Sequence, residues 1–569
     1  MGTRGLEVVR FNSRYYIRFH AYDSYYKGLG AKIVAGIPTD HNEYQEWLQS
    51  MRDKYAKKQR ALDILIHTVH EDVPIDYSQF DEFETLPSEI PRLNCYDAEY
   101  VYVINLDHEV LTMDYGIHWK LDNIPREDDL WRRAIKKSIY LWKPTISLQM
   151  CPEEHLASLD LELPARDMTV EFDCDMVDAK TDITQARKAF LTHLAANAVL
   201  QYKDEIMNFG REWSPDSFPF RELIFALISI TSGQTTFHSF PVFDCNPRRC
   251  PSWICIYEHM PESPGWVNRK WAGDRAPLME FGSLSHKPGE PPGVSPAETI
   301  YWFEDVLISL TLVVDGAAID KAVHWGLQQG RANFQIAILS LFRVCFAEVT
   351  SDKDGVPFVE ISHALRFSYL HEEYCMSTHP RKRPEAKTGM KIRRRYGERV
   401  LSSNCTGTID KLGSNFPGLA AMVNFFEVAA NRRAASKSEG TLPPELYDRI
   451  LDFVDYDTWR TCLHVSTAIR ANCLRKYRLD ERTRIVAGPF VRWESDSTRP
   501  RMSFDFENME TGTIVPMKWY PYLVKSIEYN WMPVIGRDRK AIMVDVCVQY
   551  EPAEDEPAED KPVEGGKKD

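Results

Sequence analysis

The spacing of apolar residues over the first part of the chain predicts strands on either side of a helix. Residues 6–19 hold two β-prone runs around an Asn-Ser pair, a pattern typical of a β-hairpin. Residues 98–113 repeat this pattern, and residues 44–66 between them have the spacing of a helix. We therefore expect an α+β module over residues 1–145, with an antiparallel sheet that a helix covers on one face.

The middle of the chain, residues 146–378, predicts a mostly helical domain. Residues 186–209 have a long helical pattern, and Pro-rich breaks such as residues 286–296 interrupt the region. The apolar runs 223–230 and 333–349 are too short, or contain an arginine, for a membrane span. We interpret both runs as buried elements and expect no contact with a membrane.

Residues 441–480 predict two short amphipathic helices. Two prolines suit the first turn of the first helix, where backbone N–H groups have no intrahelical partner. Leu446 and Ile450 recur at a spacing of four, and Asp457 is expected to cap the second helix. Helices this short need the rest of the chain or a partner to cover their apolar faces.

Three further segments complete the predicted α+β organisation. Residues 379–440 have the composition of a basic and polar linker with a short helical patch. Residues 481–550 contain short β-prone runs and predict a small strand-containing cap. Residues 551–569 carry eight Asp or Glu and three Lys, a composition typical of a disordered tail.

Composition and charge exclude several classes of protein. The chain has 569 residues, 12 Cys and a net charge of -14, which argues against a surface devoted to binding phosphates. The start lacks the pattern of a secretory signal, so we expect reduced thiols and an intracellular location, in the cytoplasm, the nucleus or both.

The sequence at 441–480 resembles the F-box, a small helical unit found in ubiquitin ligase complexes. The pattern is carried, in order, by Leu442-Pro443, Glu445-Leu446, Ile450-Leu451 and Val465-Ser466. The resemblance implies docking on the adaptor subunit of a Skp-cullin-F-box ligase and recruitment of an unknown protein substrate. The adaptor-binding positions that it implies are Leu442, Pro443, Leu446, Ile450, Leu451 and Val465. The stretch Thr467-Ala468-Ile469 replaces the usual Trp, and no leucine-rich or propeller repeats follow.

The N-terminus resembles the opening of uncharacterised fungal and viral or phage proteins that begin with Gly-Thr-Arg. That family implies no activity. The side chains that could gather in a pocket at one end of the first sheet are Arg4, His20, Asp23, Ser24, Gly28 and Gly30. Glycine would allow a ligand to approach closely. Tyr and Asp beside Gly are ordinary turn residues, so a packed turn is the favoured interpretation.

Two basic clusters lie in the predicted linker, and they are similar to a two-part nuclear import signal. They consist of Arg381, Lys382, Arg383, Arg393, Arg394 and Arg395. A solvated linker and a nucleic-acid surface are the alternatives. Few aromatic residues lie among the basic ones, which makes a single-strand binding surface less favoured.

Cofactor and metal patterns are weak, and we expect neither a cofactor nor a metal site. Gly28 and Gly30 lack the third glycine of a dinucleotide fingerprint, because position 33 is Ile33. Cys245, Cys250, Cys255 and His259 do not have the paired spacing of a structural zinc site.

The sequence therefore favours a non-catalytic substrate receptor of a ubiquitin ligase. The alternative is a multidomain enzyme with its site at the Gly-rich end of the first sheet, in which the F-box-like helices are structural. The first hypothesis predicts that Leu446 and Ile450 are accessible, and the second predicts that they are buried.

Overall fold

The computed structural model describes most of the chain. The described residues are 2–68, 98–137, 144–159, 161–240, 279–282, 293–352, 355–368, 370, 406–436, 442–493, 500–518, 530–537, 539–543, 546 and 548–550. The two basic clusters, the three cysteines and His259 of the weak metal pattern, and the acidic tail lie outside these residues.

The first sheet has five strands in the order β2-β1-β3-β4-β5. Their bounds are β1 (Gly5–Phe11), β2 (Arg14–His20), β3 (Tyr100–Asn105), β4 (Val110–Met113) and β5 (Ile117–Lys120). Both predicted hairpins are confirmed, and Asn12 and Ser13 make the first turn with φ of 48° and 61°. The Asp107 carboxylate, in the second turn, accepts hydrogen bonds from the backbone N–H groups of Asn12 (2.7 Å) and Ser13 (2.9 Å).

The expectation of a purely antiparallel sheet is wrong, because β3 pairs with β1 in parallel. β1 is largely buried, as is typical of strands in a sheet that is covered on both faces. Helix α2 (His41–Thr68), as predicted, packs on one face through the ring of Tyr55 on Tyr16. The other face packs against the body of the molecule, for example Tyr15 on Phe209. Both faces of the sheet are therefore covered.

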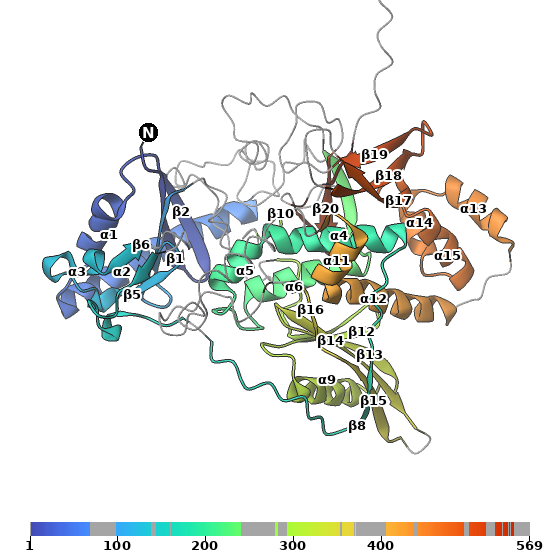
Figure 1. Ribbon diagram of the computed structural model, residues 1–569, viewed down its shortest axis with the longest axis horizontal. Helices are drawn as coiled ribbons and strands as arrows, with labels where there is room; N and C mark the ends of the chain where they lie inside the picture. The colour runs from blue at the N-terminus through green and yellow to red at the C-terminus, as the bar shows by residue number, and fades with distance from the viewer. Residues whose placement is uncertain are drawn as a thin grey trace, which may run out of the picture.

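Short elements complete this end of the molecule (Figure 1). They are a π-turn (Tyr26–Gly30), α1 (Ala31–Ala35), α3 (Leu130–Arg133), the pair β6 (Ile135–Lys137) and β7 (Pro144–Ile146), and three 3₁₀ turns at Leu121–Asn123, Glu127–Asp129 and Glu153–His155.

The middle region is not mostly helical, because it contains a seven-stranded sheet. Its strands are β8 (Asp173–Val177), β11 (Ile300–Phe303), β12 (Val306–Leu310), β13 (Phe334–Leu339), β14 (Arg343–Ser351), β15 (Pro357–Ser362) and β16 (Leu365–Arg366). The path is β11-β12-β13-β14-β15-β8, and β16 also pairs with β14. Strands buried on both faces give continuous apolar runs, which periodicity cannot distinguish from a buried helix.

Helices cover both faces of this middle sheet (Figure 1). Helix α9 (Gly316–Gln328) lies on one face, and α12 (Pro417–Ala435) with α6 (Phe218–Thr231) lies on the other. The predicted short helical patch of the linker is thus a long core helix, α12. The predicted helix at 186–209 is present but breaks at Tyr202 into α4 (Ala186–Gln201) and α5 (Lys203–Phe209), and α11 (Ile409–Asn415) packs beside α4.

The C-terminal strands do not form a separate cap. The sheet consists of β17 (Thr483–Trp493), β18 (Pro500–Asn508), β19 (Ile514–Lys518), β20 (Asn530–Ile535), β21 (Ala541–Ile542) and β22 (Val548–Tyr550), together with β9 (Thr236–Phe240) and β10 (Met279–Glu280) from the middle of the chain. Helix α4 packs on it through Phe190, whose ring meets that of Phe504 edge-on. The C-terminal sheet therefore shares one hydrophobic core with α4, α6 and α12, and we call this part of the molecule the body.

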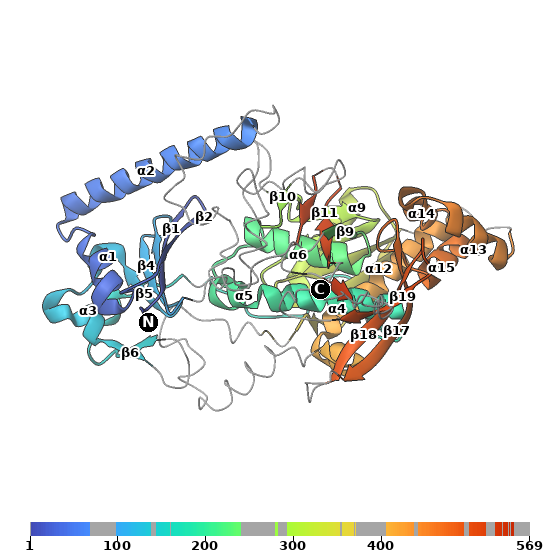
Figure 2. The same cartoon turned by 90° about the horizontal axis from the view of Figure 1, so that it is seen from above.

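Residues 442–475, which we call the three-helix unit, contain α13 (Pro444–Phe453), α14 (Tyr456–Cys462) and α15 (Thr467–Arg475). The sequence predicted two helices here, with Asp457 as a cap. Asp455 caps α14 instead, and Ser466 caps α15, so the second predicted helix is divided in two. Figures 1 and 2 show the unit at the opposite end of the molecule from the first sheet. Among the described helices, none combines the length and the apolar character that crossing a bilayer requires.

Candidate functional site

The Gly-rich turn, residues 20–30, is packed with protein atoms. A Cβ at Gly28 would lie 2.1 Å from the carbonyl oxygen of Asp23, and one at Gly30 would lie 3.0 Å from the ring of Tyr102. Ser24 is fully buried, and its carbonyl oxygen accepts a hydrogen bond from the Tyr102 hydroxyl at 2.8 Å. The sequence predicted space for a ligand beside the glycines. Asp23 and Tyr102 fill that space.

The other predicted pocket residues serve this end of the sheet in different ways. The His20 ring lies 3.0 Å from the Glu7 carboxylate across the first hairpin. The backbone N–H of Arg4 donates to Glu99, and Asp23 is exposed with a φ of 54°. The structure brings Ser24, Gly28 and Gly30 together as a packed turn, and it pairs the His20 side chain with Glu7.

The three-helix unit is anchored to the body by buried aromatic rings and arginines. Trp459, 2% exposed, stacks on Tyr456 and meets the ring of Tyr477 edge-on at 5.6 Å. The Arg478 guanidinium donates to the carbonyl oxygens of Leu451 (2.5 Å) and Val454 (2.8 Å), which would otherwise be unsatisfied at the end of α13. This anchoring fixes the direction in which α13 faces.

Helix α12 connects the same unit to the middle sheet. Arg470 of α15 donates to Asn431 at 2.8 Å, and Arg433 donates to the ring of His464 at 2.8 Å. Burial, followed by repulsion from Arg187, lowers the pKa of Arg470 to about 10. The group still carries its charge at neutral pH, so these contacts are charge-assisted.

Leu451 does not belong to an accessible face, in contrast to what the resemblance implies. Its side chain is 7% exposed and packs in the main core. The sequence placed Leu451 next to Ile450 in one pattern, but adjacent residues on a helix point in different directions. Leu451 holds α13 to the body, and it is corrected to a structural role.

The outward face of α13 carries three exposed apolar side chains. Leu446 is 45% exposed, Ile450 is 47% exposed and Phe453 is 90% exposed. Their spacing of i, i+4 and i+7 places them on one stripe of the helix. Leu442 and Pro443, which precede the helix, and Val465, between α14 and α15, are also exposed. We call these six residues the α13 face.

Phe453 was not among the predicted site residues. Its spacing of seven residues from Leu446 could have placed it on the same face of the helix. Val454, four residues after Ile450, ends the helix and packs against the core.

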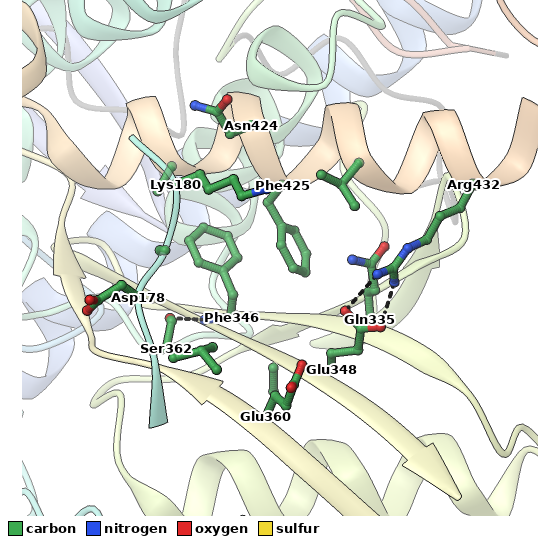
Figure 3. Close-up of a pocket in the computed structure, with 15 residues that line it drawn as sticks. Asp178, Lys180, Gln335, Phe346, Glu348, Glu360, Ser362, Asn424, Phe425 and Arg432 are labelled. Atoms are coloured by element: carbon green, nitrogen blue, oxygen red, sulfur yellow. Dashed lines mark hydrogen bonds and ion pairs between the residues drawn. The ribbon is translucent and has the colours of Figure 1, made fainter. Parts of the chain in front are cut away.

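A cavity of about 310 Å³ lies between α12 and the middle sheet. Figure 3 shows its lining, with Phe425 and Arg432 reaching down from α12 and Gln335, Glu348 and Glu360 on the strands below. We call it the α12 cavity. Sequence reasoning did not find it, because its lining comes from segments that are far apart along the chain.

Neither a search for metal-binding groups nor comparison with known proteins assigns a function to this chain. Within the described residues there is no group of three His, Cys, Asp or Glu side chains arranged to hold a metal ion. The chain matches no protein-family model, no curated protein and no solved structure.

Proposed function

We propose that this protein is a substrate receptor that docks through the α13 face on the adaptor subunit of a Skp-cullin-F-box ubiquitin ligase. The single observation that carries the proposal is the exposure of Leu446 and Ile450, the two residues whose burial the structural alternative required. An aligned stripe of large apolar side chains on a helix suits docking against an apolar surface of a partner.

The surroundings of the α13 face support a docking role. The helices behind it are held by Trp459 and Arg478, so the face keeps one orientation when a partner binds. Salt bridges Arg475–Asp448 (2.5 Å) and Arg484–Asp452 (2.7 Å) also tie α13 to α15 and β17, on the side of the helix away from the stripe.

The proposed mechanism is proximity. The adaptor holds the three-helix unit, and the remainder of the chain holds a protein substrate near the enzyme that transfers ubiquitin, in the cytoplasm or the nucleus. The chain itself would make and break no bond. Its contribution would be to convert an encounter in solution into a reaction within one complex.

The alternative of an enzyme site at the Gly-rich turn gains no support from the packing of that turn. Asp23 and Tyr102 occupy the space beside the glycines. Ser24, the residue with nucleophilic potential, is buried beneath Gly5 and Tyr102.

A pull-down of purified adaptor by the full chain tests the proposal. We expect capture by the wild type and loss of capture by the double variant Leu446→Asp, Ile450→Asp. Burying two carboxylates in an apolar interface carries a large desolvation penalty. The matched control is Ile514→Asp, which changes an exposed apolar residue of β19 in the C-terminal sheet.

Circular dichroism should show that all three proteins are folded. Absence of capture by the folded wild type would contradict the proposal. Equal capture by the double variant would remove the α13 face from it.

A further inference from the structure

The strand register aligns a row of polar residues that begins in the α12 cavity and continues beyond its lining to Asp175. Gln335 of β13 is opposite Glu348 of β14, Glu348 is opposite Glu360 of β15, and Glu360 is opposite Asp175 of β8. Residues directly opposite one another lie on the same face of a sheet, and neighbouring strands are about 4.8 Å apart. We call these four residues the polar row.

One carboxylate of the polar row already holds a guanidinium. Arg432 of α12 donates to the two oxygens of Glu348 at 2.7 and 3.1 Å, the two-point geometry that arginine makes with carboxylates. The dashed lines that start at Arg432 in Figure 3 mark this pair. The pair shows that the sheet face accommodates a planar cation lying on the row.

The next two carboxylates have no such partner. Among the described residues, neither Glu360 nor Asp175 has a hydrogen bond or ion pair, and both are exposed. Like charges that face each other across strands repel, so a second cation over Glu360 and Asp175 would be favourable. Lys180, the other basic residue of the lining, lies against α12 in Figure 3, on the opposite side of the cavity from Glu360.

A buried amide at the inner end of the row indicates that the cavity is fitted to a polar ligand. Gln335 is 7% exposed and lines the cavity, and its side-chain amide makes no hydrogen bond with a described residue. In Figure 3 its amide rises from the sheet towards α12, into the space between them. This amide offers a donor and an acceptor to a polar ligand in the cavity.

Apolar and backbone features next to the row suit an arginine carried by an extended peptide. The rings of Phe346 and Phe425 pack 4.4 Å apart and form an aromatic wall for the methylene groups of a long side chain. Strand β8 is the last in its sheet, and none of the described strands pairs with its outer edge. The stretch 171–178 along this edge contains four Asp or Glu and no Lys or Arg.

We propose that the α12 cavity binds an arginine side chain from an extended segment of a partner protein, with the guanidinium over Glu360 and Asp175 and the peptide backbone along β8. That this partner is the ligase substrate rests on the proposed function. The binding site itself does not. Helix α12 contacts both the cavity and the three-helix unit, so a partner held in the cavity is held by the element that supports the α13 face.

The test is fluorescence anisotropy of the full chain with a labelled peptide of Ser, Gly and Ala that carries one central arginine. The control peptide carries citrulline, which keeps the shape of arginine and loses its charge. We expect saturable binding of the arginine peptide, and binding weakened about tenfold by Glu360→Gln or by citrulline, since each removes one charge-assisted contact. The matched control Glu298→Gln, which removes an exposed carboxylate outside the row, should leave the affinity unchanged.

Equal affinity for the arginine and citrulline peptides would overturn the proposal, as would unchanged binding by the folded Glu360→Gln variant. The Glu360→Gln chain should still capture the ligase adaptor. Loss of adaptor capture by the Leu446→Asp, Ile450→Asp variant with intact peptide binding would show that the two sites are independent. Peptide binding without any adaptor capture by the wild type would contradict the proposed function but would still support the arginine site.

Discussion

Sequence patterns predicted a site in both the Gly-rich turn and the three-helix unit. The structure packs the first and leaves apolar side chains of the second exposed. In the turn, Ser24 is buried and a Cβ at Gly28 or Gly30 would meet neighbouring atoms. These residues pack within the protein and leave no space for a ligand. In the three-helix unit, Trp459 and Leu451 fold inward while Leu446 and Phe453 remain exposed. The difference teaches that a sequence pattern indicates a binding site only where some of its residues stay exposed after the local structure has packed.

The largest expected effect concerns the buried half of the three-helix unit. Trp459→Ala should lower the free energy of unfolding of this unit by about 3–5 kcal/mol, because it opens a cavity between Tyr456 and Tyr477. Hydrogen exchange over residues 456–462 should become faster. Unchanged exchange would mean that the unit does not depend on the body.

A smaller loss is expected in the Gly-rich turn. Gly28→Ala should lower the free energy of unfolding by about 3 kcal/mol, because the new methyl group would meet the Asp23 carbonyl oxygen, a backbone atom with little freedom to move. Thermal unfolding measures the effect. A control change at Gly413, where nothing lies within 4 Å of a Cβ, should have a much smaller cost. A stable Gly28→Ala protein would reopen the turn as a possible ligand site.

Acidification should lower the free energy of unfolding through His193, which lies in α4, between the two regions. Burial lowers the pKa of His193 in α4 from 6.5 to about 4, so between these values the unfolded chain binds a proton that the folded chain does not. Stability present above pH 6.5 is therefore lost as the pH falls, by about 2 kcal/mol between pH 7 and pH 5. Denaturant titrations at several pH values measure this slope, and His193→Gln should flatten it. An identical slope in the variant would contradict the assignment.

The smallest effect on stability is expected on the α13 face. Phe453→Ser should change the free energy of unfolding by less than about 0.5 kcal/mol, because the ring is already in water. The comparison with Trp459→Ala, in the same unit, separates folding from docking. A large loss of stability in Phe453→Ser would mean that Phe453 packs against the chain in solution.

Local patterns in the sequence were sufficient for the elements that depend on neighbours along the chain. The hairpin at Asn12 and the helix that became α2 follow from turn residues and apolar spacing. The parallel pairing of β1 with β3 and the addition of β9 to the C-terminal sheet join segments far apart in sequence, and no local pattern encodes them.

The candidate sites were predictable to different degrees for the same reason. Leu446, Ile450 and Phe453 of the α13 face lie on one helix, so their spacing is visible in the sequence, although the inward turn of Leu451 required the rest of the protein to be in place. The polar row depends on the register of four strands, so Glu360 and Asp175 could not be paired beforehand. The Gly-rich turn failed as a pocket because Asp23 folds back onto Gly28.

The most direct measurement is photo-crosslinking of the full chain to purified adaptor with benzoylphenylalanine placed at Phe453 or, for comparison, at Tyr22 in the Gly-rich turn. Both side chains are highly exposed, so a difference between them reports the interface rather than accessibility. The account predicts a crosslink to the adaptor from position 453 and none from position 22. No crosslink from position 453, or equal crosslinking from both positions, would contradict docking through the α13 face.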